Sequence, residues 1–86
     1  MNNKDKKYPK GVESDPGKLQ KQLGHRIKQL RIKQGYTSYE YFAYEHNISR
    51  AQFGRYEKGQ DLRFSSLIKV INAFGMTVDE FFSEGF

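Results

Sequence analysis

Arg50 and Arg55 lie five residues apart near the middle of the chain, so both can lie on the exposed side of one helix. A guanidinium group can donate two hydrogen bonds to O6 and N7 of guanine, a contact worth roughly 1–3 kcal/mol of discrimination between bases. Ala51 can offer its methyl group to a thymine methyl, and Gln52 can pair with adenine or hold a phosphate. The alternative is that both arginines are solvated surface charges.

The residue pattern predicts that these side chains lie on a helix that opens at Ser49 and stops at Gly59. Ser49 and Gln52 have the spacing of a capping box, in which the serine oxygen accepts from a first-turn amide. Phe53 and Tyr56 fall on the opposite side of this helix by periodicity. We therefore expect them in the core.

A second short helix is predicted just before it. Thr37 and Glu40 also have capping-box spacing, which favours a start at Thr37 over one at Ser38. This helix ends near His46, and Asn47 follows, a residue that tolerates left-handed backbone. Two short helices separated by about three residues are the arrangement of a helix-turn-helix.

A helix of about 18 residues is predicted before this pair. Asp15 is its expected N-cap, Pro16 takes the first helical position, and Gly35 is its stop. Its apolar stripe consists of Leu19, Leu23, Ile27 and Leu30. Residues 1–14 are polar and are predicted to be a mobile basic arm, either a solubilising tail or a segment that follows a DNA backbone. The bases of this arm are Lys4, Lys6, Lys7 and Lys10.

Two further helices are predicted after Gly59. Ser65 or Ser66 caps the fourth, and Thr77 opens a final short helix through a capping box with Glu80. The apolar residues assigned to these segments are the loop anchors Leu62 and Phe64, the stripe Leu67, Val70, Ile71 and Phe74, and Val78 and Phe81 as the residues that close the bundle. The expected fold is all-α, a compact bundle of four to five short helices over residues 15–86.

The composition excludes several classes of protein. The 86 residues form one small domain without cysteine, so disulfide scaffolds and thiolate metal sites are excluded. His25 and His46 have no cysteine or paired carboxylate beside them, and no nucleophile–base pair is evident. We expect no metal, cofactor, small-molecule ligand or enzymatic activity. No segment approaches the ~20 apolar residues of a membrane span, and the N-terminus lacks the apolar stretch of a signal peptide. A cytoplasmic location is expected.

The formal charge of +5 is distributed unevenly. Residues 15–35 hold six bases against one acid, whereas residues 60–86 hold two bases against four acids. A basic segment indicates a polyanion partner only when a reading element lies beside it. Here the basic segment directly precedes the predicted pair of short helices.

From Leu23 to Phe82 the sequence resembles the Cro/C1-type (XRE) helix-turn-helix family. The family's pattern can be followed in LGHRIKQLRIKQG, in SYEYFAYEHNISRAQFGRYEKG and in SSLIKVINAFGMTVDEFF. The most specific stretch is ISRAQFGRYEKG, which resembles the recognition helix. The resemblance implies a bundle of four or five helices like the lambda repressor domain, and sequence-specific binding of double-stranded DNA.

The resemblance also implies roles for individual residues. It places the base readers at Arg50, Ala51 and Arg55, on the helix from about Arg50 to Lys58, and it pairs Arg31 with Glu57. Contacts to phosphates are expected from Ser49, Gln52 and Lys58. Tyr39 stands where the family usually has a phosphate-contacting glutamine, and its hydroxyl can donate to a phosphate instead.

Two features of the sequence leave alternatives open. Gly54 lies inside the predicted recognition helix at a cost of about 1 kcal/mol. It either admits a DNA strand or neighbouring side chains, or it is a tolerated defect. Phe82 and Phe86 crowd a terminal segment, where exposed aromatics suggest a homodimer contact. The alternative is that Phe82 folds back onto the domain and Phe86 makes no contact. The leading hypothesis is a transcriptional regulator, most simply a repressor. The alternative is a protein-interaction module of the same fold, a bridging factor or an antitoxin-like partner, with secondary DNA binding.

Overall fold

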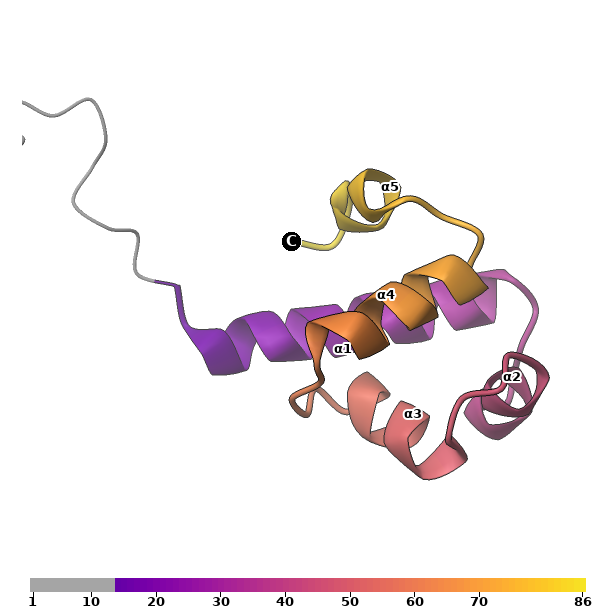
Figure 1. Ribbon diagram of the computed structural model, residues 1–86. Helices are drawn as coiled ribbons and strands as arrows, with labels where there is room; N and C mark the ends of the chain where they lie inside the picture. Colours follow the sequence, from indigo (N-terminus) through magenta and orange to yellow (C-terminus); the bar gives the residue numbers. More distant parts are fainter. Residues whose placement is uncertain (1–13) are drawn as a thin grey trace, which may run out of the picture.

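The computed structural model describes residues 14–86, which form five helices and no strand (Figure 1). In chain order the helices are α1 (Pro16–Lys33), α2 (Tyr39–Glu45), α3 (Arg50–Glu57), α4 (Phe64–Ala73) and α5 (Val78–Phe82). The predicted all-α bundle is confirmed. The arm predicted for residues 1–14 lies outside the described residues, apart from Ser14.

Helix α1 begins and ends where the sequence predicts. The Asp15 carboxylate accepts a hydrogen bond from the Gly17 amide at 3.0 Å, and Gly35 follows the helix with a φ of 94°. Ile27 and Leu30 are buried, but Leu19 is 41% exposed. The expected stripe is therefore only partly buried, because the first turns of α1 extend past the other helices (Figure 1).

The start of α2 corrects the prediction at Thr37. Ser38 is the N-cap, and its hydroxyl oxygen accepts from the Tyr41 amide at 3.2 Å, so the Thr37–Glu40 capping box does not form. The turn before α2 is held by Arg31, whose carbonyl accepts from the Tyr36 amide at 3.1 Å. The chain remains extended through Ser38, which explains why the helix starts one residue later.

The connection from α2 to α3 follows the prediction. Asn47 has a φ of 59°, in the left-handed region, and Ser49 caps α3 by accepting from the Gln52 amide at 3.3 Å. Helix α3 ends at Glu57, with Lys58 as its C-cap, and Gly59 follows with a φ of 84°.

Helix α4 starts earlier than predicted, which corrects two assignments. Its N-cap is Arg63, not Ser65 or Ser66, and no side chain caps the helix. The Leu67 amide donates to the Arg63 carbonyl at 3.0 Å, so the first turn already contains both serines. Phe64 therefore sits in the first turn and is 71% exposed, rather than anchoring the loop.

Helix α5 forms the predicted capping box and is fixed on α1. Thr77 accepts from the Glu80 amide at 3.1 Å while the Glu80 carboxylate accepts from the Thr77 amide at 2.8 Å. Arg26 of α1 donates to the Phe81 carbonyl at 2.8 Å and to the Glu80 carbonyl at 3.1 Å. Phe81 is fully buried, but Val78 is 41% exposed. Val78 therefore does not close the bundle as predicted.

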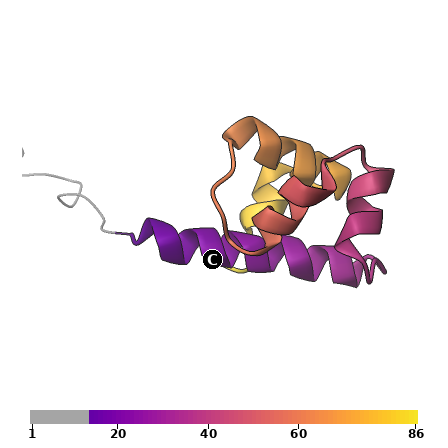
Figure 2. The same cartoon turned by 90° about the horizontal axis from the view of Figure 1, so that it is seen from below.

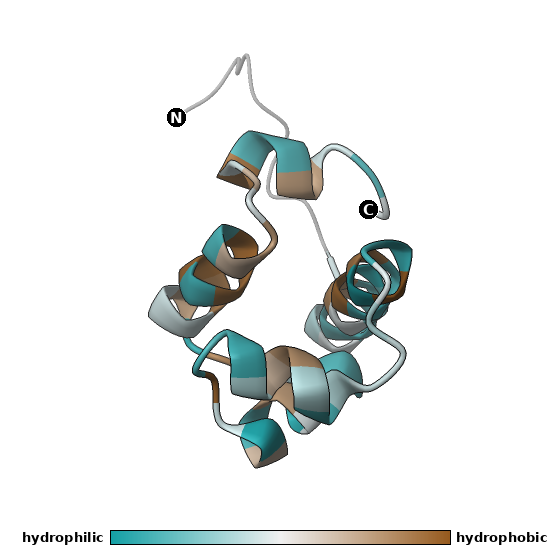
Figure 3. Ribbon diagram, turned by 90° about the vertical axis from the view of Figure 1, so that its right-hand side faces the viewer, coloured by the Kyte–Doolittle hydropathy of each residue, from teal (hydrophilic) through white to brown (hydrophobic). Residues whose placement is uncertain are grey.

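The core forms around Phe42, where the helices meet. The Phe42 ring lies 5.1 Å from the Phe53 ring and 5.0 Å from the Phe74 ring, so it joins α2 to α3 and to the end of α4. The largest fully buried side chains are Phe42, Phe53, Phe81, Ile27, Ile71 and Val70. In Figure 3 the hydrophobic parts of the helices turn toward the interior that they share.

A carboxylate shared by two tyrosines joins α2 to the turn before it. Tyr36 donates to Glu45 at 2.6 Å and Tyr41 donates to the other carboxylate oxygen at 2.7 Å. Both hydrogen bonds favour the ionised carboxyl. The bond from Tyr36 and then that from Tyr41 hold the pKa of Glu45 below its ordinary value of 4.5, and the same bonds raise the pKa of each phenol above 10.0.

This cluster predicts a measurable pKa. A carboxyl whose pKa is lowered by folding stabilises the fold above its unfolded pKa, and that contribution is lost as pH falls through the folded pKa. NMR titration of Glu45 in the wild type is expected to give a pKa below 4.5, and in Tyr36→Phe/Tyr41→Phe a pKa that moves back up. An unchanged Glu45 pKa in the double variant would contradict the shared-carboxylate assignment.

Candidate nucleic-acid interface

Helix α3 has one buried side and one exposed side. Phe53 and Tyr56 are buried at 0% and 7% exposure, which confirms that they belong to the core. The side chains on the exposed side are Arg50, Ala51, Gln52, Arg55 and Lys58, with Ser49 exposed at the N-cap. Seen from below in Figure 2, α3 lies in front of the other helices. The residues expected to read bases are thus brought together on one accessible surface.

A buried ion pair fixes α3 on α1. Arg31 donates to Glu57 through Nε at 2.7 Å and through Nη2 at 3.0 Å. Its third contact, from Nη1, goes to the Tyr36 carbonyl at 2.7 Å. The two side chains are only 5% and 8% exposed. The pair expected from the family resemblance is therefore present, and removing one partner of such a buried pair costs about 3–5 kcal/mol.

Gly24 allows the backbones of α1 and α3 to approach closely. A Cβ at this position would lie 2.6 Å from the Tyr56 carbonyl oxygen and 2.8 Å from that of Glu57. No side chain fits between these backbone atoms. The apolar periodicity of the sequence did not predict a role for Gly24. A glycine inside an apolar helical stripe costs stability, so its presence indicates a position where close packing requires a residue without a side chain.

The structure favours one of the alternatives left open at Gly54. A Cβ there would lie 2.8 Å from Cε1 of Tyr39 and 3.2 Å from its hydroxyl oxygen. Gly54 therefore admits a neighbouring side chain, and the half-buried Tyr39 ring covers it. As a result, the Tyr39 hydroxyl, at the start of α2, lies against α3 at Gly54.

A recess of about 350 Å³ separates α3 from the start of α4. It is lined by Gln52, Arg55, Tyr56, Asp61, Leu62, Arg63 and Ser66. Because no side chain caps α4, its first-turn amides are available to an anion, and the helix dipole favours negative charge at that end. Arg63 was not predicted as a contact, because the sequence pattern favoured Ser65 or Ser66 as the N-cap of α4. With a serine as the cap, no uncapped helix end would lie beside Arg63.

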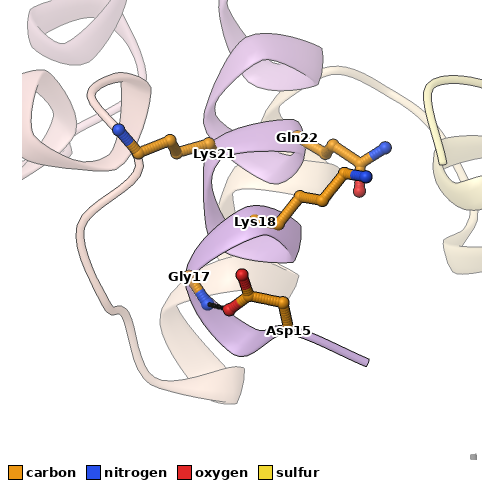
Figure 4. Close-up of a pocket in the computed structure, with 5 residues that line it drawn as sticks. All are labelled: Asp15, Gly17, Lys18, Lys21 and Gln22. Carbon is orange, nitrogen blue, oxygen red and sulfur yellow. Dashed lines mark hydrogen bonds between the residues drawn. The ribbon is translucent and has the colours of Figure 1, made fainter. Parts of the chain in front are cut away.

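The basic segment of α1 is less available than its composition suggests. Arg26 is committed to the carbonyls of α5 and Arg31 to Glu57. The four remaining cations of α1 are exposed: Lys18, Lys21, Lys28 and Lys33. The first turns of α1 also line an open recess. Its only acidic residue is Asp15, whose carboxylate already accepts a hydrogen bond from the Gly17 amide (Figure 4).

Comparison of the chain with protein-family models, with curated proteins and with solved structures finds no match. The class of protein therefore has to be inferred from the residues and their geometry. Within residues 14–86, no cluster of three or more histidine, aspartate or glutamate side chains could hold a metal ion. No helix of that same region is both long and apolar enough to cross a membrane.

The contact between Tyr39 and Gly54 predicts coupled substitutions. Alanine in place of glycine inside a helix gains about 1 kcal/mol, and we expect that full gain for Gly54→Ala in a Tyr39→Ala background. In the wild type the new methyl group displaces the Tyr39 ring, so the gain is smaller or reversed. Chemical denaturation of the four proteins of this cycle measures the difference.

The control for this cycle is Tyr44→Ala, because Tyr44 lies on the same helix and is 76% exposed. Gly54→Ala should have the same effect in that background as in the wild type. Equal effects of Gly54→Ala with and without the Tyr39 ring would refute the contact.

Proposed function

We propose that this protein is a sequence-specific DNA-binding regulator of the Cro/C1 helix-turn-helix class, in which α3 enters the major groove. The observation that carries the proposal is the two-sided character of α3. Its buried side is fixed by Phe53, Tyr56 and the Arg31–Glu57 pair, while its exposed side presents two arginines. A rigid helix with outward guanidinium groups is what major-groove reading requires.

In this proposal Arg50 and Ala51 contact base edges from the first turn of α3, and Arg55 does so one turn later. The arginines select guanine through paired hydrogen bonds, and Ala51 contacts a thymine methyl group. Ser49 and Lys58, at the two ends of the helix, contact phosphates and set its position along the duplex.

Two neighbouring features supply further phosphate contacts. The Tyr39 hydroxyl lies against α3 from the side of α2, so it can donate to the strand that passes that helix. The recess at the open end of α4 combines first-turn amides with Arg63 and Gln52, which suits a phosphate on the other side of α3. Contacts on both flanks would hold α3 at a fixed depth in the groove.

The resemblance to the Cro/C1 family favours a repressor that acts by occupying its binding site, and a cytoplasmic location suits that role. A second candidate function, a protein-interaction module with secondary DNA binding, is favoured by a different observation. The C-terminal segment is acidic and leaves Phe82 and Phe86 41% and 48% exposed, on a surface other than α3. The two candidate functions are distinguished by whether the arginines of α3 determine duplex binding.

The test compares Arg50→Ala/Arg55→Ala with a variant of equal charge, Lys33→Ala/Lys69→Ala, whose lysines are exposed on α1 and α4. Fluorescence anisotropy is measured over a range of salt concentrations with a labelled duplex that the wild type has selected from a random pool. Each lost phosphate contact reduces the slope of log K against log salt by about 0.9. We expect the arginine variant to lose more affinity than the lysine variant, while circular dichroism shows that both remain folded.

Equal losses in the two variants would mean that only overall charge matters, and the proposal that α3 reads DNA would fail. Absence of any salt-sensitive duplex binding by the folded wild type would favour the interaction module.

A further inference from the structure

Four basic side chains form a row on the exposed side of α1. At spacings of three, four and three residues, this basic row consists of Lys18, Lys21, His25 and Lys28. Residues with these spacings share one side of a helix. All four side chains are exposed. Because a helix rises about 1.5 Å per residue, the basic row is about 15 Å long.

No other helix of residues 14–86 covers this side of α1. In Figure 1, α4 lies in front of α1, α5 lies above it, and α2 and α3 lie below it. In Figure 2 the same four helices all lie to one side of α1. Ile27 and Leu30 are buried, and helical periodicity places them opposite Lys18 and Lys21. The basic row therefore occupies the uncovered side of α1.

The charges of the basic row have no partners among residues 14–86. Helix α1 contains no aspartate or glutamate, and the ion pairs that its side chains form with the rest of this region use Arg26 and Arg31 instead. Lys18 and Lys21 are like charges three residues apart, an arrangement that destabilises a helix. The charges of the row therefore do not stabilise the fold, and they are available to a polyanion outside the domain.

The chemistry of the basic row suits the backbone of a nucleic-acid duplex. Lysine ammonium groups contact phosphates as point charges, and a duplex presents phosphates at short, regular intervals along its length. The row contains no phenylalanine or tyrosine on which the bases of a single strand would stack. Insertion into a membrane surface requires an exposed apolar side, whereas Ile27 and Leu30 are buried in the core. A duplex backbone is therefore the partner that the row fits best.

The basic row faces a different direction from the exposed side of α3. In Figure 2, α3 lies in front of the other helices, whereas the uncovered side of α1 faces the lower edge of the view. A helix is about 10–12 Å across with its side chains, so α3 separates α1 from any duplex that lies on the exposed side of α3. A duplex bound there would leave the basic row open to a second one.

We propose that the basic row binds the phosphate backbone of a second DNA duplex without reading its sequence, so that one chain holds two DNA segments together. Lys18, Lys21 and Lys28 supply the charge, and the ring of His25 donates a hydrogen bond to a phosphate between them. The inference rests on the proposed function for the first duplex, which α3 holds. Binding of a duplex by the row itself does not require α3.

The first experiment measures bridging by the full chain. A duplex that the wild type has selected from a random pool is fixed to beads, and retention of a labelled free duplex without the selected sequence is measured. At equal occupancy of the fixed duplex, we expect Lys21→Gln/Lys28→Gln to retain about tenfold less of the free duplex than the wild type. The matched control is Lys33→Gln/Lys69→Gln, which removes the same charge at exposed positions outside the row and should retain the free duplex as the wild type does. Both variants should bind the selected duplex equally well.

The second experiment does not depend on sequence reading by α3. Isotopically labelled Arg50→Ala/Arg55→Ala is titrated with a random-sequence duplex at about 50 mM salt and followed by NMR. We expect the amide signals of residues 18–28 to shift. Adding Lys21→Gln/Lys28→Gln to this protein should reduce the slope of log K against log salt by about 1.8, which is about 0.9 for each lost phosphate contact.

Equal retention of the free duplex by the row variant and its control would overturn the inference, as would unchanged amide signals of residues 18–28. Weaker binding of the selected duplex by the row variant than by its control would mean that the row contacts the first duplex instead. Polyglutamate and phosphatidylglycerol vesicles, added at the same charge concentration, should shift these signals less than the duplex does, and a larger effect of either would overturn the assignment to DNA. Shifts on α1 without any sequence preference of the wild type would refute only the proposed function.

Discussion

The arrangement of the domain depends on one buried guanidinium group. Arg31 of α1 uses its three donor nitrogens on three contacts, two to Glu57 at the end of α3 and one to the Tyr36 carbonyl in the turn before α2. A bidentate pair fixes direction as well as distance. Because both side chains are almost fully buried, neither charge has an alternative partner in water. The position of α3 relative to α1 and α2 is therefore set at this point.

Two glycines permit the close packing that this ion pair requires. Gly24 brings the backbone of α1 against the end of α3, and Gly54 brings the Tyr39 ring of α2 against its middle. Together with the buried Phe53, these contacts hold the inward side of α3. The exposed side is what remains, and it carries Arg50 and Arg55.

Local signals in the sequence predicted most of the helix ends. Asp15, Ser49 and Thr77 act as caps because each cap depends only on residues two or three positions away. Thr37 had an equally good local pattern, but the Arg31–Tyr36 bonds hold the chain extended past it. Side-chain burial was harder to predict, because periodicity treats Leu19 and Val78 like their buried neighbours. Leu19 is exposed because the first turns of α1 extend past the other helices, and Val78 is exposed at the start of α5. The open end of α4 and the role of Gly54 likewise needed tertiary contacts.

The central claim is that the exposed side of α3 reads base sequence. Selection of bound duplexes from a random pool tests it most directly, because the protein itself then chooses the sequence that it binds. The account predicts an enriched motif with guanines at the positions contacted by Arg50 and Arg55, and loss of preference at one of these positions when the corresponding arginine is replaced by alanine. A pool that shows no enriched sequence, or a motif that persists unchanged in both arginine variants, would contradict it.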